Sequence, residues 1–586
     1  MKAVVLMFDT LTKHHISTYG GSAITPNFER LAKHSVQFNN FYVGSMPCMP
    51  ARREMHTGRY NFLHRSWGPL EPFDFSMPEH LSKNKIHTHL VTDHKHYWRD
   101  GGATYHPRYS TFEFIRGQEG DNWKGHVAKP TVNYDGKEEQ AVINRRVKRM
   151  TQDFINRDYM KTEEEHTLTR TVEKGLEFIS KNSEQDNWFL QLECFDPHEP
   201  FFVPDKYLEM YGCCQKDFDG WMYYNANTDS PEKQTLIRKF YQALITMCDE
   251  YLGKVLDSFD EHDLWSDTML MVCTDHGFLL GEHDWWGKNI MPVYNEIANT
   301  PFYLWDPRVG KRGEQSNALA QTIDIAATVL EYFDFEIPKQ MEGRSISQHL
   351  ASGDKIRDYA LFGYFGAHIN ITDGQYVYMR APRDRNNTLN EYTLMPTHID
   401  SRFGIKQLSQ AELHDGFDFT LGAKLLKVPT SINYTNAFRF GDKLFDLEAD
   451  PTQETAIADH PKALEFCDAI KKELIRNEAP KELYARYTLD EFDLASIKRE
   501  HDSFVAYQTS LFANVDLLHH SVAEGLEIVV NVGDDRESTL STVLSIINKI
   551  DQPVSPRDVF DIAESIFKGE QLKKAIYQLN MAMRYY

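Results

Sequence analysis

The sequence predicts an α/β fold in which a mainly parallel central sheet is flanked by helices. Two observations predict it: short apolar runs recur along the first three quarters of the chain, and amphipathic helical patterns stand between them. Alternation of this kind is typical of βαβ units, which build parallel sheets. A third observation, a change to shorter strand-like segments from about residue 355, indicates a smaller unit of a different class.

Four apolar runs are the expected strands of the central sheet. They are AVVLMF at 3–8, THLVT at 88–92, WFLQLECF at 188–195 and TMLMVCT at 268–274. Each is short and bounded by polar segments, as in strands that are buried on both faces. Two segments between these runs, 168–179 and 234–259, place apolar residues at helical spacing and are the expected crossover helices.

A chain of 586 residues exceeds the size at which a single hydrophobic core stops growing, so we expect several domains. We predict an α/β domain over residues 1–355 and a smaller α+β subdomain over 356–480. The subdomain contains the strand-like QYVYMRA and DKLFDLEADP and the helical PKALEFCDAIKKELI. The segments LSTVLSIINKI, VFDIAESIF and KKAIYQLNMAM predict a mostly helical C-terminal extension over 481–586.

Charge and hydropathy limit the partners. The net charge is -22, which argues against nucleic acid and against anionic membrane surfaces, because both would be repelled over most of the molecule. The sequence contains no apolar run long enough to span a bilayer. An anionic substrate would therefore need a local cationic pocket.

The cysteines and the N-terminal segment indicate the compartment. Seven cysteines, an odd number, are scattered along the chain without a disulfide spacing pattern. The first apolar run is too short for a signal-peptide core and leads directly into Asp9, so no export signal is visible. We therefore expect a reduced, cytoplasmic protein.

Acidic residues follow two of the predicted strands. Asp9 closes the first strand, and Asp275 with His276 closes the fourth. Because the carboxyl ends of parallel strands face one crevice, these side chains are expected to meet there. Two carboxylates and an imidazole suit calcium, magnesium or manganese, and ligand type alone does not exclude zinc. The alternative is that these residues are strand-end caps and a hydrogen-bonded turn residue.

One cysteine lies in an unusual segment, SMPCMPARREMHTGR at 45–59. Cys48 stands between two prolines and is followed by Arg52 and Arg53. Cationic neighbours and a helix N-terminus would lower the pKa of the thiol and make it a nucleophile. The alternative from the residues alone is an inert cysteine.

The segment CMPAR, continuing to Thr-Gly-Arg, resembles the sulfatase signature Cys-x-Pro-x-Arg. The resemblance extends in order through VVLMFDT, FDPHEPFFVPDKY, CTDHGFLLGEHDWWGKN and DLEADPTQETAIADHP, and covers about residues 1–475. It implies an alkaline-phosphatase-like α/β core. It also implies that a formylglycine-generating, sulfatase-maturing enzyme converts Cys48 to formylglycine, whose hydrate is the nucleophile.

The resemblance also implies roles for individual residues. It implies one divalent cation, with calcium expected and magnesium or manganese as alternatives. The implied ligands are Asp9, Thr10, the modified Cys48, Asp275 and His276. His198 is the implied general acid for the leaving oxygen, and Lys288 and Arg52 would neutralise the transferring anionic group.

The sequence departs from the family pattern at two places. Thr10 stands where many sulfatases have a second aspartate, so a hydroxyl or carbonyl oxygen replaces one carboxylate ligand. The family's Gly-Lys-x-x-His element is replaced after the second expected strand by TDHKHYW, where His94 and His96 are candidates for the same anion-binding and proton-transfer role. A histidine at the position of His276 is also found in sulfatases that act on iduronate 2-sulfate and in phosphonate monoester hydrolases. This residue therefore does not distinguish a sulfate substrate from a phosphate substrate.

The sequence thus predicts a hydrolase that cleaves a sulfate monoester of a sugar or other small substrate. The first alternative is a phosphonate monoester or phosphodiester hydrolase of the same superfamily. The second is a non-catalytic binding protein in which Cys48 stays unmodified.

Overall fold

A computed structural model describes residues 1–132, 140–227, 229–383, 389–430, 437–457 and 460–489. The predicted helical extension lies outside the described residues from 490 onward. Within the described residues, no helix combines the length and the apolar character needed to cross a bilayer.

An eight-stranded sheet forms the centre of the molecule, in the order β13-β2-β12-β9-β1-β7-β5-β6. All neighbours pair in parallel except β12, which runs antiparallel to both β2 and β9. The four apolar runs are strands of this sheet, as predicted. The strands are β1 (Lys2–Phe8), β2 (Val36–Phe38), β5 (His87–Thr92), β6 (Thr111–Phe114), β7 (Trp188–Cys194), β9 (Thr268–Cys273), β12 (Phe302–Trp305) and β13 (Glu314–Ser316).

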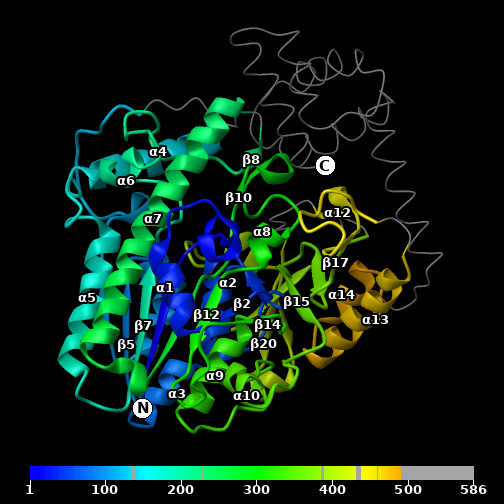
Figure 1. Ribbon diagram of the computed structural model, residues 1–586. Coiled ribbons are helices and arrows are strands. Elements are labelled where there is room, and N and C mark those ends of the chain that lie inside the picture. Colours follow the sequence, from blue (N-terminus) through cyan, green and yellow to red (C-terminus); the bar gives the residue numbers. More distant parts are fainter. Residues whose placement is uncertain (133–139, 228, 384–388, 431–436, 458–459, 490–586) are drawn as a thin grey trace.

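Helices cover both faces of this sheet (Figure 1). Alternate residues of β1 enter two different cores, because successive side chains of a strand point to opposite faces. Val4, Leu6 and Phe8 pack with α1 (Pro26–His34), α5 (Thr167–Asn182) and α7 (Pro231–Glu261). Ala3, Val5 and Met7 pack with α2 (Cys48–Thr57), α3 (Met77–Lys83) and α9 (Ile323–Tyr332). This three-layer arrangement confirms the predicted fold class.

Local signals set the starts of the two predicted crossover helices. The side chain of Ser230 accepts a hydrogen bond from the Lys233 amide, and Pro231 occupies the first turn of α7, where a missing N–H costs nothing. In α5, the side chain of His166 accepts a hydrogen bond from the Leu168 amide. Both helices include the segments predicted from their spacing.

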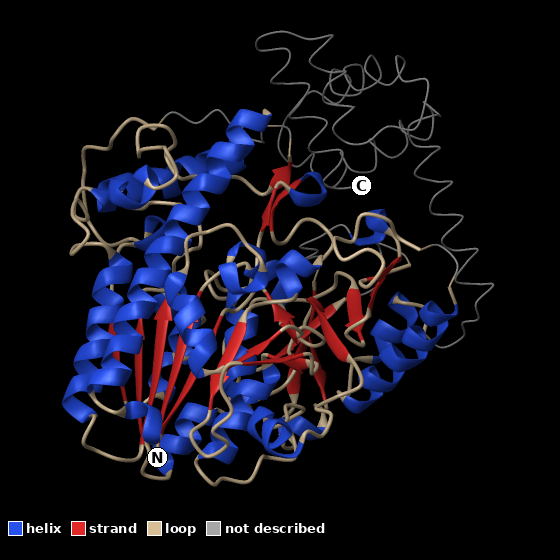
Figure 2. Cartoon of the chain, in the orientation of Figure 1, coloured by secondary structure: helices blue, strands red, loops and turns tan. Residues whose placement is uncertain are grey.

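A five-stranded sheet lies beside the first, in the order β21-β17-β16-β15-β4 (Figure 2). Its strands are β4 (Ser45–Met46), β15 (Ala360–Tyr364), β16 (Ile369–Thr372), β17 (Tyr376–Arg380) and β21 (Lys443–Asp446). It packs against α13 (Pro461–Arg476) and α14 (Lys481–Arg486). The short strand β4, which directly precedes Cys48, pairs in parallel with β15. The domain boundaries proposed from the sequence stay predictions.

The remaining strands are short. Three small sheets contain β3 (Phe41–Tyr42) with β14 (Ala320–Gln321), β8 (Asn225–Ala226) with β10 (Leu279–Leu280) and β11 (Trp285–Gly287), and β18 (Asn390–Thr393) with β19 (Glu412–His414) and β20 (Leu425–Pro429). The other helices are α4 (Gln140–Arg157), α6 (Asp205–Glu209), α8 (Asn295–Ala298), α10 (Ile346–Ser352), α11 (Ile405–Leu408) and α12 (Ala437–Phe440).

Candidate active site

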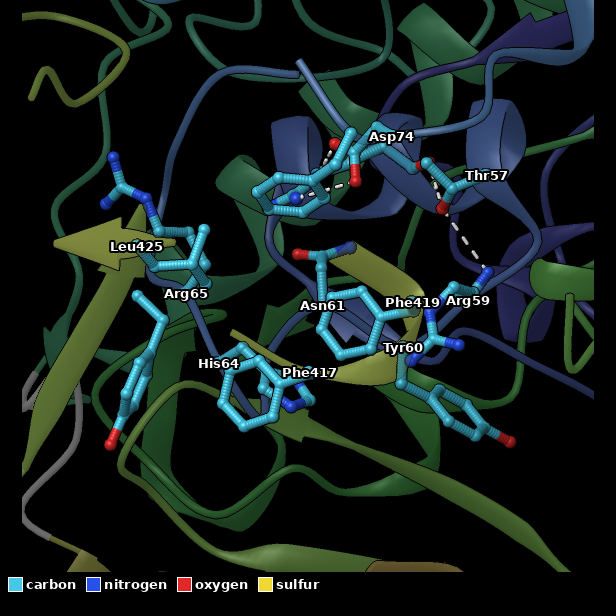
Figure 3. Close-up of a pocket in the computed structure, with 13 residues that line it drawn as sticks. Thr57, Arg59, Tyr60, Asn61, His64, Arg65, Asp74, Phe417, Phe419 and Leu425 are labelled. Carbon is cyan, nitrogen blue, oxygen red and sulfur yellow. Dashed lines mark hydrogen bonds and ion pairs between the residues drawn. The ribbon is translucent and has the colours of Figure 1, made fainter. Parts of the chain in front are cut away.

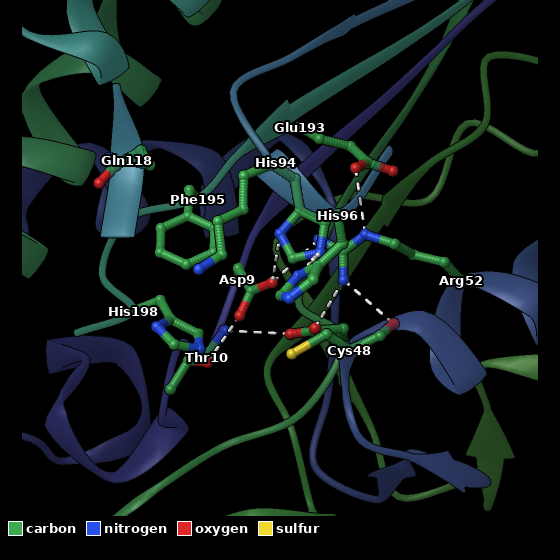
Figure 4. Close-up of polar contacts among 12 residues, drawn as sticks. Asp9, Thr10, Cys48, Arg52, His94, His96, Gln118, Glu193, Phe195 and His198 are labelled. Carbon is green, nitrogen blue, oxygen red and sulfur yellow. Dashed lines mark hydrogen bonds and ion pairs between the residues drawn. The ribbon is translucent and has the colours of Figure 1, made fainter. Parts of the chain in front are cut away.

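The site lies at the carboxyl edge of the central sheet, where β1, β9, β7 and β5 end. Asp9 directly follows β1, and its amide donates to the Cys194 carbonyl over 2.9 Å, which continues the pairing with β7. Asp275 follows the adjacent strand β9. The parallel register therefore brings the two carboxylates together, as expected from the sequence. Figure 4 shows Asp9 beside Cys48 and Arg52.

Cys48 is the first residue of α2 and is buried. Its Sγ lies 3.3 Å from Nε2 of His276 and 3.7 Å from Nζ of Lys288. One possible ligand atom from each of Asp9, Cys48, Asp275 and His276 lies within 4.8 Å of the others. The helix start thus places the cysteine at the same strand ends as the two carboxylates.

The pKa of Cys48 does not follow the simplest sequence hypothesis. Burial, and then the neighbouring Asp9 carboxylate, raise the pKa of the thiol well above its usual range, although Lys288 opposes them. The expected help from Arg53 is absent, because its guanidinium donates to Asp74 over 2.7 and 2.9 Å. The hypothesis of a plain thiolate activated by Arg52 and Arg53 is therefore wrong for the unmodified cysteine.

Arg52 forms ion pairs with the buried carboxylates of the site. It is fully buried, and its guanidinium donates to Asp9 over 2.9 Å, to Asp275 over 2.8 Å and to Glu193 over 3.2 Å. Its Nη1 also donates to the Cys48 carbonyl over 3.1 Å. The arginine of the Cys-x-Pro-x-Arg segment thus fixes both carboxylates relative to the first turn of α2.

Thr10 and Lys288 form the other side of the cluster. Thr10 has φ +64°, a rare conformation for a β-branched residue, which places its amide on Asp275 at 3.0 Å. Its hydroxyl donates to Asp9 over 2.6 Å and accepts from Nζ of Lys288 over 3.1 Å. Backbone strain of this type is concentrated at functional sites.

The residues present fit a divalent cation. Burial, and then repulsion from Asp275, raise the pKa of Asp9 well above its ordinary value. Burial also acts against ionisation of Asp275, but the charges of His276 and Arg52 hold its pKa below the usual range. Two buried carboxylates that repel each other, with an imidazole nitrogen beside them, form a donor set suited to such an ion.

The two histidines of the TDHKHYW segment are also at this site. Nδ1 of His94 lies 3.5 Å from Asp9, and Nε2 of His94 lies 3.1 Å from Nδ1 of His96. His96 reaches outward, with its Nε2 3.8 Å from Asp400. Burial lowers the pKa of both imidazoles well below the ordinary value. His94 therefore contacts the metal-ligand cluster, and His96 continues the chain of polar contacts away from it.

His198 belongs to the loop after β7 and is buried. Its Nδ1 hydrogen-bonds the Glu199 carbonyl over 2.6 Å, and its ring packs on Phe195 with centroids 4.3 Å apart. Burial, and then the charge of Lys288, lower the pKa of His198 well below its usual value. The structure thus brings all the residues singled out from the sequence into one region, where their individual roles remain predictions.

The sequence analysis missed Glu193 and Tyr97. Glu193 is the residue before the last in strand β7. Its carboxylate accepts a hydrogen bond from Arg52 over 3.2 Å and from the Tyr97 hydroxyl over 2.8 Å. Both side chains are fully buried. A charged residue inside the apolar run WFLQLECF was the available signal, because buried carboxylates need partners.

A separate small cavity of about 20 Å³ lies toward the other end of α2 (Figure 3). It is lined by Arg53, Arg59 and Arg65, together with aromatic residues such as Phe417 and Phe419. This volume is about that of one water molecule. The cavity is part of the contact between the α2 region and the β18-β20-β19 sheet, and it contains none of the cluster residues.

Comparisons with known proteins agree with this arrangement. The family model for sulfatases matches residues 2–335. An arylsulfatase from Clostridium perfringens is 24% identical over 401 residues, covering 61% of this chain and 80% of the relative. An N-acetylglucosamine-6-O-sulfatase from Bacteroides thetaiotaomicron is 23% identical over 401 residues, covering 60% and 71%.

The crystal structure of a phosphonate monoester hydrolase from Agrobacterium radiobacter has the same fold, with a TM-score of 0.54 and 17% identity. The match covers 82% of this chain and 95% of that structure. The fold and the buried Asp–Cys–Asp–His cluster thus define a hydrolase with an alkaline-phosphatase-like core. The chain belongs to the sulfatase family, the sulfuric ester hydrolases of that class.

Proposed function

We propose that this enzyme hydrolyses a sulfate monoester of a sugar or another small molecule, with formylglycine made from Cys48 as its nucleophile. The observation that carries the proposal is the contact of Cys48 with His276 and Lys288, beside two carboxylates held by one buried arginine. Formylglycine at position 48 would supply a geminal diol, with one hydroxyl as the nucleophile and the other for release of the sulfate.

The residues around position 48 bind and neutralise the transferring group. Burial acts against the charge of Lys288, but the Cys48 thiol and then Glu199 raise its pKa, and its Nζ lies 3.7 Å from Cys48 Sγ and 3.1 Å from the Thr10 hydroxyl. Arg52 holds the carboxylates in place and offsets their charge. His198 is the proposed proton donor to the leaving oxygen. Lys288 and the proposed divalent cation would together supply the local positive charge that an anionic ester needs on a protein whose net charge is -22.

One divalent cation is part of the proposal, with calcium as the ion and magnesium or manganese as alternatives. Asp9, Asp275, His276 and the modified side chain at 48 would hold it, with the Thr10 hydroxyl beside them. When bound, the ion polarises the ester oxygens and favours deprotonation of the diol.

The partners and compartment follow from the same proposal. A formylglycine-generating enzyme must act on Cys48, and the small sulfated substrate carries the anionic group that Lys288 faces. A sugar is supported by the N-acetylglucosamine-6-O-sulfatase among the relatives. We also propose a reducing, cytoplasmic setting, since all seven cysteines are free thiols.

A phosphonate monoester or phosphodiester hydrolase is the second candidate. It is supported by His276 in the ligand cluster and by the fold shared with a phosphonate monoester hydrolase. Parallel turnover of 4-nitrophenyl sulfate and 4-nitrophenyl phenylphosphonate, by protein produced with a maturing enzyme, separates the two. We expect a higher kcat/KM for the sulfate ester, and the reverse order would favour the alternative. No turnover of either ester would favour a binding protein with unmodified Cys48.

A further inference from the structure

We propose that Glu199 is the positioning residue for His198, holding it in one tautomer and stabilising the protonated imidazole that donates to the leaving oxygen. The inference rests on the proposed function, in which His198 is the proton donor. Glu199 is the third residue of the PHEP segment that begins at Pro197, and it directly follows His198.

The geometry of the pair carries the proposal. Nδ1 of His198 lies 2.6 Å from the Glu199 carbonyl oxygen and 3.1 Å from Oε2 of the Glu199 carboxyl group. Because a carbonyl oxygen can only accept, Nδ1 must carry a proton and donate it. The other nitrogen, Nε2, is then the one that can exchange a proton with a substrate.

The carboxyl group of Glu199 is held in place from its other side. The Tyr224 hydroxyl donates to Oε1 over 2.6 Å, and the glutamate is 5% exposed. Oε2 accepts no hydrogen bond within the described part of the chain, although it is buried. A buried carboxylate oxygen with no other partner, 3.1 Å from an imidazole N–H, is suited to stabilise positive charge on that ring.

The charges around the pair explain why His198 needs such a partner. Burial and Lys288 both disfavour the imidazolium. The charged and titratable groups that face the pair are Lys288, Glu119, Arg149, Asp275, His276, His94 and His96. Burial raises the pKa of Glu199 to about 7, so the carboxylate that would stabilise the imidazolium forms as the pH rises through neutrality.

The proton transfer is balanced as follows. The nucleophilic oxygen at position 48 would enter as the deprotonated hydroxyl, its proton already lost to solvent. The bond between sulfur and the ester oxygen breaks as sulfur bonds to that oxygen, and the electron pair of the broken bond goes to the leaving oxygen. That oxygen takes the proton from Nε2 of the His198 imidazolium. The imidazole becomes neutral, and Nδ1–H keeps its hydrogen bond to the Glu199 carbonyl.

The test measures kcat/KM of the Glu199→Gln variant for two sulfate esters that differ in their leaving group. Only the ester with a poor leaving group needs the proton that His198 donates to the leaving oxygen. We expect kcat/KM for an alkyl sulfate to fall about 10- to 100-fold, the range for loss of a residue that orients a reactive group. For 4-nitrophenyl sulfate, whose leaving group needs no proton, we expect a change of less than about 3-fold. Retained aryl turnover also shows that the variant is folded.

The pH profile provides a readout that a merely structural role would not move. Without the carboxylate, the His198 imidazolium is less stable. The alkaline limb of the pH profile of kcat/KM for the alkyl sulfate is therefore expected to move to lower pH by about one unit. Tyr224→Phe keeps the carboxyl group but releases it, and a smaller change in the same direction is expected. The matched control is Glu391→Gln, which changes another buried carboxyl group beside a histidine, Glu391 with His398 at 3.0 Å, and should leave both esters unaffected.

The outcomes are distinguishable. Equal loss of both esters in Glu199→Gln, or an unmoved pH limb, would overturn the role of Glu199 while leaving the proposed function intact. A parent enzyme that cleaves neither ester would contradict the proposed function and this inference together.

Discussion

Arg52 carries the most concentrated set of charge contacts in the site. Three carboxylates, those of Asp9, Asp275 and Glu193, accept from one guanidinium, and all four side chains are fully buried. A buried ion pair adds little net stability compared with apolar residues, but removing one partner leaves uncompensated charge. Arg52 is therefore required to keep the three acids in a dry site.

The first prediction follows from this burial. Arg52→Ala should lower the free energy of unfolding by about 3–5 kcal/mol, measured by urea denaturation, because three buried carboxylates lose their cation. Arg30→Ala is the matched control, since Arg30 also pairs with two aspartates, Asp257 and Asp260, but at the surface. Its cost should be about 0–1 kcal/mol. Similar losses in the two variants would contradict the account.

Glu54, in the same helix, is a buried acid that has no cationic partner among the described residues. It accepts from the amide of Ser45 over 2.6 Å and from the hydroxyls of Ser45 and Thr322. Burial raises its pKa to about 7 in spite of these hydrogen bonds. The side chain ties α2 to β4 and so fixes the helix start at Cys48.

The second prediction concerns pH. The folded-state pKa of about 7 lies above the ordinary value of 4.5, so the folded protein binds this proton more tightly than the unfolded chain. The stabilisation is complete below about pH 4.5 and is lost as the pH rises to about 7, by about 3 kcal/mol in total. Glu54→Gln should flatten this part of the stability curve, measured by urea unfolding between pH 5 and 8. Parallel curves for the variant and the parent would contradict it.

At the scale of elements, the segment after β9 that contains Asp275 and His276 depends on close contact with α8. The Gly277 amide donates to the Ile297 carbonyl over 2.8 Å. A Cβ at position 277 would lie 1.9 Å from the Glu296 carbonyl oxygen, so only glycine fits. This contact positions His276 and Asp275, the two residues before the glycine.

The third prediction tests that contact. Gly277→Ala must push α8 away from the segment, and the free energy of unfolding should fall by about 1–3 kcal/mol, with reduced turnover. Gly125→Ala is the control, because nothing lies within 4 Å of a Cβ there. Its effect should stay within about 0.5 kcal/mol. Chemical denaturation and steady-state assays of both variants measure the difference, and a Gly277→Ala protein as stable as Gly125→Ala would count against the contact.

Some of these elements could be predicted from the sequence and others could not. The runs that became β1, β5, β7 and β9 were visible because strands buried on both faces are continuously apolar. The meeting of Asp9 and Asp275 followed from parallel strands alone. The two-residue strand β4 has no periodicity to detect, and the antiparallel direction of β12 is set by tertiary pairing. The direction of the Cys48 pKa was misjudged, because burial depends on packing that the sequence does not state.

At the scale of the whole molecule, the two sheets are connected through the site. The strand β4 is close to the N-terminus in sequence, but it pairs with β15, which lies about 300 residues later, in the five-stranded sheet. Ser45 is opposite Gly363 and Met46 is opposite Tyr364. The Tyr364 hydroxyl also donates to the Lys288 carbonyl. The smaller sheet therefore supports both Cys48 and Lys288.

The fourth prediction is that residues 1–355, the α/β domain proposed from the sequence, do not fold cooperatively alone. Without β15, the strand before Cys48 loses its partner, and the core that contains Tyr42, Met46 and Phe362 is opened. Circular dichroism and thermal unfolding of the fragment, beside residues 1–489 as the control, measure this. A parent-like cooperative transition of the shorter fragment would contradict it.

The central claim concerns Cys48, and mass spectrometry of the tryptic peptide that contains it tests the claim most directly. The protein should be produced with and without a formylglycine-generating enzyme and assayed on 4-nitrophenyl sulfate before and after chelation. The account predicts a loss of about 18 mass units at Cys48 only with the maturing enzyme, together with sulfate release that chelation abolishes. An unmodified thiol in both preparations, or turnover equal in the two, would contradict it.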